Sequence, residues 1–327
     1  MTRLRLFAMI AGLMVLLVLP QLGNNYIAYI LNLILVNCLI GIGLNIVLGY
    51  AGQFAFVSAA LTGLGAYAAA IVTTRFGLSF WIALPCAALL ASAVGLISAI
   101  PAIKTSRVYL ALVTLAFAEL VQWGFVHWKA VTAGTDGLGV SPPSLFGVAI
   151  VRDDQRYYLL LVAVILVYVL VWRLLHTRFG RSLIAIRTNE VLAACNGISV
   201  AGTKLGAFAL SGFVTGIGGA FFALTTGHIS PTDFSLNMLV MQFSVVVIGG
   251  LASLPGSIIG AIVITALPEL LREAQSMQEI IYGVVLMVCI VVMPKGIAGF
   301  FTRIRLISPE ILVGRWRGKP IVQQASG

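Results

Sequence analysis

The segment from His176 to Lys204 gathers charged and polar side chains between two strongly apolar runs. In its first half, arginines alternate with aliphatic residues; these are Arg178, Arg181, Leu183, Ile184, Ile186 and Arg187. The alternation places an apolar face beside a basic one. Such a surface is suited to binding another molecule and not to catalysis. Two interpretations stay open on the residues alone: an amphipathic loop lying on anionic lipid, or a helix that fits a groove on a soluble protein.

The second half of this segment has the signals of a short helix. Thr188 is placed to cap it, and Glu190 lies in its first turn, where the helix dipole favours an anion. Gly197 suits the position just after the helix, where a left-handed residue ends it. The predicted helix has about eight residues and a length of about 12 Å. Because so short a helix is marginal alone in water, we expect a binding partner or the rest of the chain to hold it.

The sequence contains no set of residues typical of an enzyme. Walker A, His-Glu-x-x-His and Gly-x-Ser-x-Gly motifs are all missing. The three histidines are His127, His176 and His228, and the four cysteines are Cys38, Cys86, Cys195 and Cys289. The histidines are scattered and no two cysteines have metal-site spacing. We therefore predict a chain without catalytic residues, metal or cofactor, whose energy source is another protein.

Glu119 is the only carboxylate deep inside a long apolar run, twelve residues after Arg107. An ionisable group at such a depth costs about 2–3 kcal/mol on insertion scales and usually faces the interior of a helix bundle. It lines a transport path in one interpretation and pairs with a polar neighbour such as Gln122 in the other. The same two roles, path lining or hydrogen bonding between helices, apply to Asn45, Gln53, Ser58 and Thr62.

Composition and charge identify the class of protein as a polytopic helical membrane protein. Of the 327 residues, 60% are hydrophobic and 9% charged, and no charged residue lies between Arg5 and Arg75; a soluble domain has about 25% charged residues. The ten predicted spans are roughly 6–22, 26–48, 52–74, 79–101, 107–128, 157–175, 204–227, 235–252, 256–271 and 279–294. A count of nine, or a re-entrant pair at the eighth and ninth, also fits. We interpret residues 6–22 as a first span rather than a cleaved signal peptide, since no small-x-small site follows.

The distribution of charge predicts the orientation of the chain. With both termini cytoplasmic, the inner segments hold these basic residues: Arg3, Arg5, Lys104, Arg107, Arg173, Arg178, Arg181, Arg187, Lys204, Lys295, Arg303, Arg305, Arg315, Arg317 and Lys319. The positive-inside rule therefore explains the net charge of +10 and favours an even number of spans. We expect one membrane domain, residues 1–301, a basic tail, residues 302–327, and no binding of nucleic acid.

Glycines at four-residue spacing, such as Gly212 and Gly216, predict close helix contacts.

Several ordered blocks of the sequence resemble the branched-chain amino acid ABC transporter permeases of the LivM type. They are residues 43–70, 109–119, 134–138, 178–223, 230–234, 246–261 and 293–300. The resemblance runs from about residue 25 to 300. Within it, Glu190, Ala193, Ala194 and Gly197 form a loose version of the Glu-Ala-Ala…Gly signature of ABC importer coupling helices, with the alanines displaced.

This resemblance implies a ten-span permease of the cobalamin-importer type in a bacterial inner membrane, with the coupling loop after the sixth span. The implied partners are a LivH-like sister permease, two cytoplasmic ATPases that carry ATP and Mg²⁺, and an extracytoplasmic binding protein. The residues predicted to contact the ATPase are Arg181, Ile184, Arg187, Glu190, Ala194 and Gly197. Those predicted to meet the binding protein are Thr135, Asp136 and Asp233.

Alternatives to a branched-chain amino acid importer remain at this point. Relatives of this permease type transport urea, amides or small aromatic acids, and the sequence does not distinguish these substrates. A secondary transporter would instead contain paired intramembrane charges or broken helices in inverted halves. Glu119 and the Gly/Pro break near residues 249–256 are the features that point that way.

Overall fold

The computed structural model describes residues 25–270, except for positions 104, 106, 141–143, 146–147 and 150–151, together with the single positions 283, 287 and 296–297. Five of its helices are long and apolar enough to cross a membrane. They are α2 (Asn25–Asn45) with its π-helical extension η2 (Ile46–Tyr50), α4 (Phe80–Ser98), α5 (Arg107–His127), α7 (Asp153–Leu175) and α10 (Val200–Thr226). The predicted spans 6–22 and 279–294 and the tail 302–327 lie outside the described residues, the single positions 283 and 287 apart.

Three further apolar helices are shorter: α3 (Ser58–Thr74), α11 (Leu236–Gly249) and α12 (Leu254–Leu270). Each of the eight apolar helices corresponds to one predicted span. In lipid a backbone must satisfy its own hydrogen bonds, and the helix does this within one segment. Long apolar runs therefore translate directly into helices, and the helical, polytopic class predicted from the sequence is confirmed.

The third predicted span, 52–74, begins later than expected. Residues 51–57 form neither helix nor strand, and the helix starts only at Ser58. Gly52 has a φ of +65°, and this left-handed turn after η2 ends the preceding helix. Two backbone amides of this segment have acceptors nearby: that of Gln53 donates to the Val47 carbonyl at 3.0 Å, and that of Phe56 donates to Thr114 Oγ1 at 3.0 Å.

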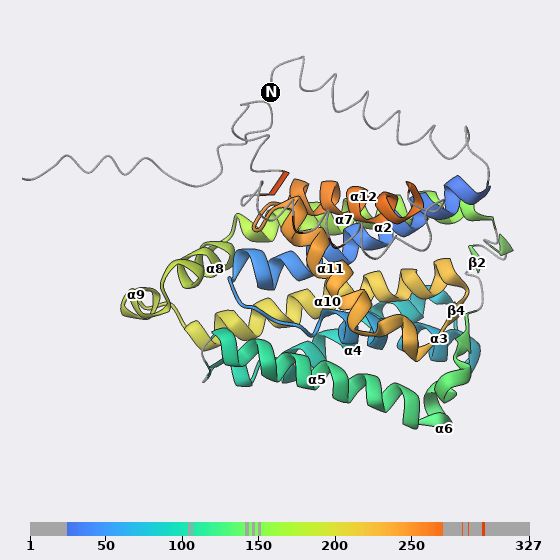
Figure 1. The fold of residues 1–327 in the computed structure, drawn as a ribbon, viewed down its shortest axis with the longest axis horizontal. Helices are drawn as coiled ribbons and strands as arrows, with labels where there is room; N and C mark the ends of the chain where they lie inside the picture. Colours follow the sequence, from blue (N-terminus) through green and yellow to red (C-terminus); the bar gives the residue numbers. More distant parts are fainter. Residues whose placement is uncertain are drawn as a thin grey trace, which may run out of the picture.

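Helix α10 lies at the centre of the bundle and packs against α2, α3 and α4 (Figure 1). A Cβ added at Gly212 would stand 2.4 Å from the Ala91 carbonyl oxygen, and one at Gly219 would stand 2.0 Å from that of Thr62. Glycine is thus required for these helix backbones to approach each other, as the spacing of the glycines predicted. In the same way α11 and α12 meet at Gly249 and Gly260.

Short elements close the two ends of the bundle. At one end lie α8 (Arg178–Thr188) and α9 (Glu190–Cys195), with η3 (Pro101–Ile103) beside them. The opposite end, on the right in Figure 1, carries α6 (Lys129–Thr132), η4 (Gly134–Asp136), η5 (Pro231–Phe234) and two small antiparallel sheets. The sheets pair β1 (Leu138–Gly139) with β4 (His228–Ile229) and β2 (Ser144–Leu145) with β3 (Val148–Ala149).

Candidate functional site

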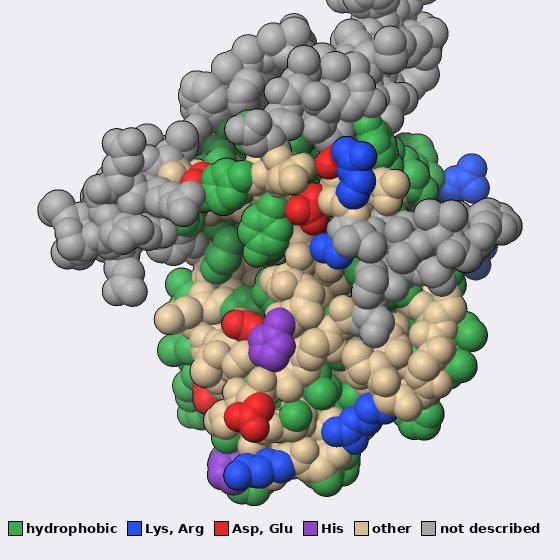
Figure 2. Space-filling view, turned by 90° about the vertical axis from the view of Figure 1, so that its right-hand side faces the viewer, with side chains coloured by type: hydrophobic (Ala, Val, Ile, Leu, Met, Phe, Trp, Pro, Cys, Tyr) green, Lys and Arg blue, Asp and Glu red, His purple; other side chains and the backbone are tan. Residues whose placement is uncertain are grey.

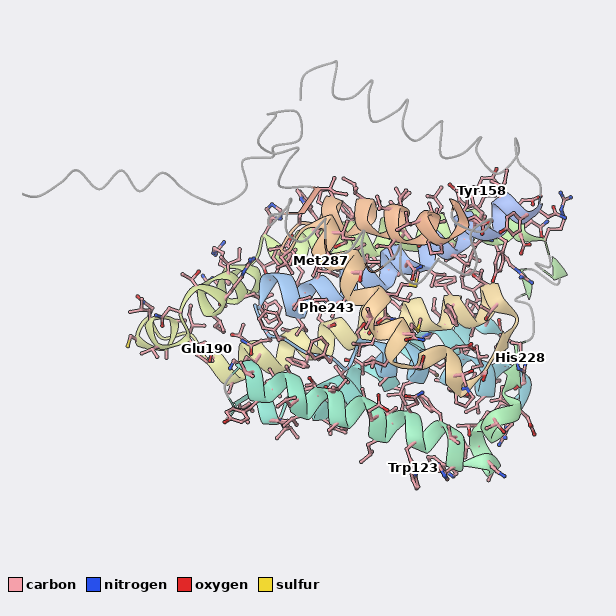
Figure 3. All side chains as sticks on the ribbon, viewed as in Figure 1. Trp123, Tyr158, Glu190, His228, Phe243 and Met287 are labelled. Carbon is pink, nitrogen blue, oxygen red and sulfur yellow. The ribbon has the colours of Figure 1, made fainter. Side chains whose placement is uncertain are left out.

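The polar segment 176–204 forms two helices that project from one end of the bundle, with Glu190 at the start of the second (Figure 3). The apolar face predicted for the first half of the segment packs inward. Leu183 and Ile186 on α8 are buried, and Gly180 lets α8 approach the end of α7, since a Cβ there would stand 2.0 Å from the Leu175 carbonyl oxygen. The bundle itself therefore holds this segment in place.

The start of α9 corrects one detail of the prediction. Its cap is Asn189, whose Oδ1 accepts hydrogen bonds from the amides of Val191 at 2.9 Å and Leu192 at 3.1 Å. Thr188 was the wrong cap because its backbone still belongs to α8 and its hydroxyl donates to the Ile184 carbonyl. A capping residue must be extended, and Asn189 has that conformation, with φ −160° and ψ 115°.

The end of α9 is as predicted, although the helix has six residues rather than about eight. Gly197 has a φ of +77°, and its amide donates to the Ala194 carbonyl at 2.9 Å. The next amide, of Ile198, donates to the Ala193 carbonyl at 3.1 Å. These two bonds form a Schellman motif, which stops the helix and fixes the direction of the chain toward α10.

An ion pair between a buried lysine and a half-buried glutamate joins this projecting loop to the bundle. Lys204 Nζ on α10 lies 2.8 Å from Glu190 Oε2, and it also donates to the Ala102 carbonyl at 2.9 Å. Gln53 Nε2, from the non-helical segment 51–57, donates to Glu190 Oε1 at 3.0 Å. The Lys204 side chain is 3% exposed and that of Glu190 32% exposed. One carboxylate therefore ties α9 to two separate parts of the bundle.

The remaining residues predicted to contact an ATPase divide by exposure. Arg181, Ile184, Ala194 and Gly197 are exposed, whereas Arg187 is half-buried. Arg187 lies against the turn at Gly52, where an added Cβ would stand 2.7 Å from its Cγ. The predicted set is thus partly outward-facing and partly directed at the bundle.

Sequence reasoning missed the most exposed apolar residues of the loop. Val191 is 71% exposed and Leu192 61% exposed, side by side in the first turn of α9. The sequence signal that would have indicated these two residues is a pair of large apolar side chains in the first turn after a capping Asn. Lys204 was also missed as a functional residue, because its partner Glu190 stands fourteen positions earlier in the chain.

The four polar residues at the predicted second-to-third span junction all form hydrogen bonds between separate elements. Asn45 bonds to Ser257 Oγ at 2.7 Å and to the backbone of residues 252 and 253. Gln53 contacts Glu190, as described above. Ser58 and Thr62 of α3 both contact the side-chain amide of Gln242 on α11. All four residues therefore hydrogen-bond to distant parts of the chain, and whether any of them also lines a path stays a prediction.

Glu119 lies on the outer surface of α5, where it is exposed. It forms no hydrogen bond or ion pair with any residue that the structure describes, so the pairing with Gln122 is not present there. Within the same described residues, no group of three or more His, Cys, Asp or Glu side chains is placed to hold a metal ion.

The residues predicted to meet a binding protein gather at the opposite end of the bundle. Thr135, Asp136 and Asp233 are exposed there, on η4 and η5, which contact each other. The Asp233 carboxylate accepts the Ser230 amide at 2.8 Å and so fixes its own turn. Acidic and basic side chains both lie on this end (Figure 2). The structure thus brings two distant loops of the sequence into one surface.

Comparisons with known proteins fit this arrangement. The family described as branched-chain amino acid transport system / permease component matches residues 26–293. The LivM permease of Escherichia coli K12 is 30% identical over 292 residues, which are 82% of this chain and 69% of LivM. The probable LivH permease of Methanocaldococcus jannaschii is 28% identical, over 88% of this chain and 96% of the relative.

A more distant similarity extends to the ribose import permease RbsC of Bacillus subtilis, which is 28% identical over 39% of this chain and 43% of RbsC. No solved structure matches the chain significantly. The family match covers most of the sequence and includes both the α8–α9 loop and the two end surfaces. This chain belongs to the family of permease components of branched-chain amino acid transport systems.

Proposed function

We propose that this chain is one of two membrane subunits of an ATP-driven importer for branched-chain amino acids, and that α8 and α9 dock a cytoplasmic ATPase. One observation carries the docking role. A short, well-capped helix exposes two large apolar side chains, Val191 and Leu192, while its Glu190 is anchored inward on Lys204. An exposed apolar pair at the tip of a fixed loop suits a groove on a soluble partner.

The proposed topology has ten spans and both termini in the cytoplasm of a bacterial cell, as in permeases of the cobalamin-importer type. The eight described apolar helices and the two apolar runs 6–22 and 279–294 together make ten. The basic residues of the α8–α9 loop favour a cytoplasmic location for it. The end with η4 and η5 then faces outward, where Thr135, Asp136 and Asp233 would meet a substrate-binding protein.

The network around Glu190 supports a mechanism of alternating access. When two ATPases bind ATP and close, a docked α9 moves with them. Because Glu190 bonds to Lys204 and Gln53, that movement reaches α10 and the non-helical segment 51–57 together. Closely packed helices such as α10 and α4 then shift as rigid bodies. ATP and Mg²⁺ act on the ATPases, and this chain supplies contacts that differ between its two states.

The partners in this proposal are a LivH-like sister permease, two ATPases, the binding protein and membrane lipid. The proposal is tested by purifying an affinity-tagged form of this chain from membranes and identifying the proteins that copurify with it. An ATPase should copurify in stoichiometric amounts, and leucine uptake into proteoliposomes should require ATP and the binding protein. A secondary transporter predicts the opposite result, with uptake by this chain alone. If the complex takes up urea or an amide in preference to leucine, the proposal of an ATP-driven importer stands and only the proposed substrate is wrong.

The exposed pair on α9 provides a first prediction. Val191→Asp and Leu192→Asp should each weaken ATPase copurification about 30-fold or more, because an apolar anchor in the centre of an interface contributes about 2 kcal/mol. Asp is favourable in the first turn of a helix, so neither variant should unfold α9. Retained ATPase in both variants would contradict docking through α9.

A matched control is Leu236→Asp at the start of α11. Leu236 is 50% exposed, also lies in the first turn of a helix, and stands at the opposite end of the bundle. This variant should copurify the ATPase as the unmodified chain does. Equal losses in the control and the α9 variants would indicate a general effect of the added charge.

A further inference from the structure

Helix α5 presents an exposed stripe along its length. It forms one edge of the bundle (Figure 1), and 22% of the residues along its apolar stretch are buried, against 78% for α2 with η2. Trp123 points away from the other helices in Figure 3. The exposed residues at helical spacing are Tyr109, Leu112, Val113, Ala116, Glu119, Leu120, Trp123 and His127. All but Glu119 and the terminal His127 are apolar or aromatic.

Glu119 does not suit a surface covered by lipid. It lies about 18 Å along the helix from Arg107 and about 12 Å from His127, well inside a hydrocarbon core of about 30 Å. No basic residue occurs on α5 between these two positions. An unpaired carboxylate at this depth is costly in lipid and is stable where it faces water or a cation.

Helix α7 presents an exposed surface of the composition that suits contact with lipid. Its exposed residues in the middle of the span are all aliphatic: Val162, Ile165, Leu166, Val169 and Leu170. Leu166 lies near the middle of α7, as Glu119 does in α5, and both are exposed. The difference between the two stripes is the carboxylate, which marks the α5 face as one that lipid does not cover.

We propose that this face of α5 lines the transport path between the two permease subunits, and that the Glu119 carboxylate binds the ammonium group of the amino acid in transit. The surroundings of Glu119 fit such a ligand. Trp123 lies one turn away, and its ring, stacked on one side against His127 with 4.3 Å between the ring centroids, is an aromatic group of the kind that attracts a cation. Ala116 and Leu120 offer an apolar surface for an aliphatic side chain. The inference rests on the proposed function, because it places the substrate of the importer.

Transport by the reconstituted complex tests the role of the charge. Glu119→Gln should lower the rate of radiolabelled leucine uptake about tenfold or more, since a charged hydrogen bond contributes about 1.5–3 kcal/mol. Glu119→Asp should restore part of the rate, and Leu166→Ala should leave it unchanged. ATPase copurification should stay normal in all three. Normal uptake by Glu119→Gln would overturn the proposal, whereas failure of the unmodified chain to bind an ATPase would overturn the importer itself.

Thiol labelling tests the position of the residue independently of transport. In a chain whose four native cysteines are replaced and which still transports leucine, Glu119→Cys should react with a membrane-impermeant cationic thiol reagent. Leu166→Cys at the matching depth of α7 should not react. Similar reactivity of the two positions, or labelling at 166 alone, would show that α5 does not line a water-accessible path.

Discussion

Glu190→Ala is expected to destabilise the permease by about 3–5 kcal/mol and to abolish ATP-driven uptake. The variant leaves the Lys204 ammonium group, 3% exposed, with only the Ala102 carbonyl as a described acceptor. Lys204→Met should cost less, because Glu190 is 32% exposed and keeps contact with water as well as the bond from Gln53. The two halves of the ion pair therefore differ in the size of their effects.

The double variant separates a role in anchoring from a role in ATPase contact. Removing both charges leaves no buried unpaired ion, so Glu190→Ala with Lys204→Met should be more stable than Glu190→Ala alone. Thermal unfolding of the purified complex in detergent measures this difference. If the double variant is no more stable than the single one, Glu190 does not act through Lys204. Uptake should remain low in the double variant, because the loop is then no longer tied to α10.

A control for this comparison is Arg181→Ala. Arg181 belongs to the same basic loop but is exposed, and its described hydrogen bond runs to the nearby His176 carbonyl at 3.5 Å. We expect its melting temperature to stay close to that of the unmodified complex. Any change should appear in ATPase binding instead. A large loss of stability here would indicate that the loop tolerates no change of charge.

Much of the fold could be predicted from the sequence because lipid restricts the available structures. All eight described apolar helices were predicted, with boundaries shifted by a few residues at most, except at the start of α3. There the apolar residues of segment 51–57 predict a helix, but the chain forms none before Ser58. One of its backbone amides, that of Phe56, donates a hydrogen bond to Thr114 Oγ1 on another helix. A local pattern does not contain such a distant partner.

The candidate site was predictable as a region and less so as a set of contacts. Polarity, capping residues and Gly197 located the loop and the end of α9. The direction in which Glu190 points depends on Lys204 and on Gln53, which stands 137 positions away in the sequence. Charge alone could not distinguish an anchor from a contact residue. The exposure of Val191 and Leu192 likewise follows only from how α9 leaves the bundle.

The anchoring of α9 has a consequence for how force reaches the membrane helices. Lys204 lies in the first turns of α10, and α10 is the helix that α2, α3 and α4 surround. Movement of α9 therefore displaces α10, a helix at the centre of the bundle, and not a helix at its edge. For this to shift helices as units, the contacts along α10 must be tight, and these contacts are made at glycines.

Gly219→Ala should therefore destabilise the bundle by about 3 kcal/mol or more, at or above the upper end of the usual cost of overpacking. The added methyl group would stand 2.0 Å from the Thr62 carbonyl oxygen and 3.0 Å from the Ala66 amide nitrogen. Both atoms belong to the backbone of α3, so no change of rotamer relieves the clash. Helices α3 and α10 must separate, which should lower both the melting temperature and the yield of assembled complex.

Gly124→Ala on α5 is the matched control for this substitution. Nothing lies within 4 Å of a Cβ added there, and Ala favours a helix by about 1 kcal/mol over Gly. The melting temperature of this variant should equal or exceed that of the unmodified chain. If Gly219→Ala melts at the same temperature as Gly124→Ala, α10 and α3 are not in close contact in the assembled complex. In that case α10 could not transmit the movement of α9 to its neighbours as a rigid unit.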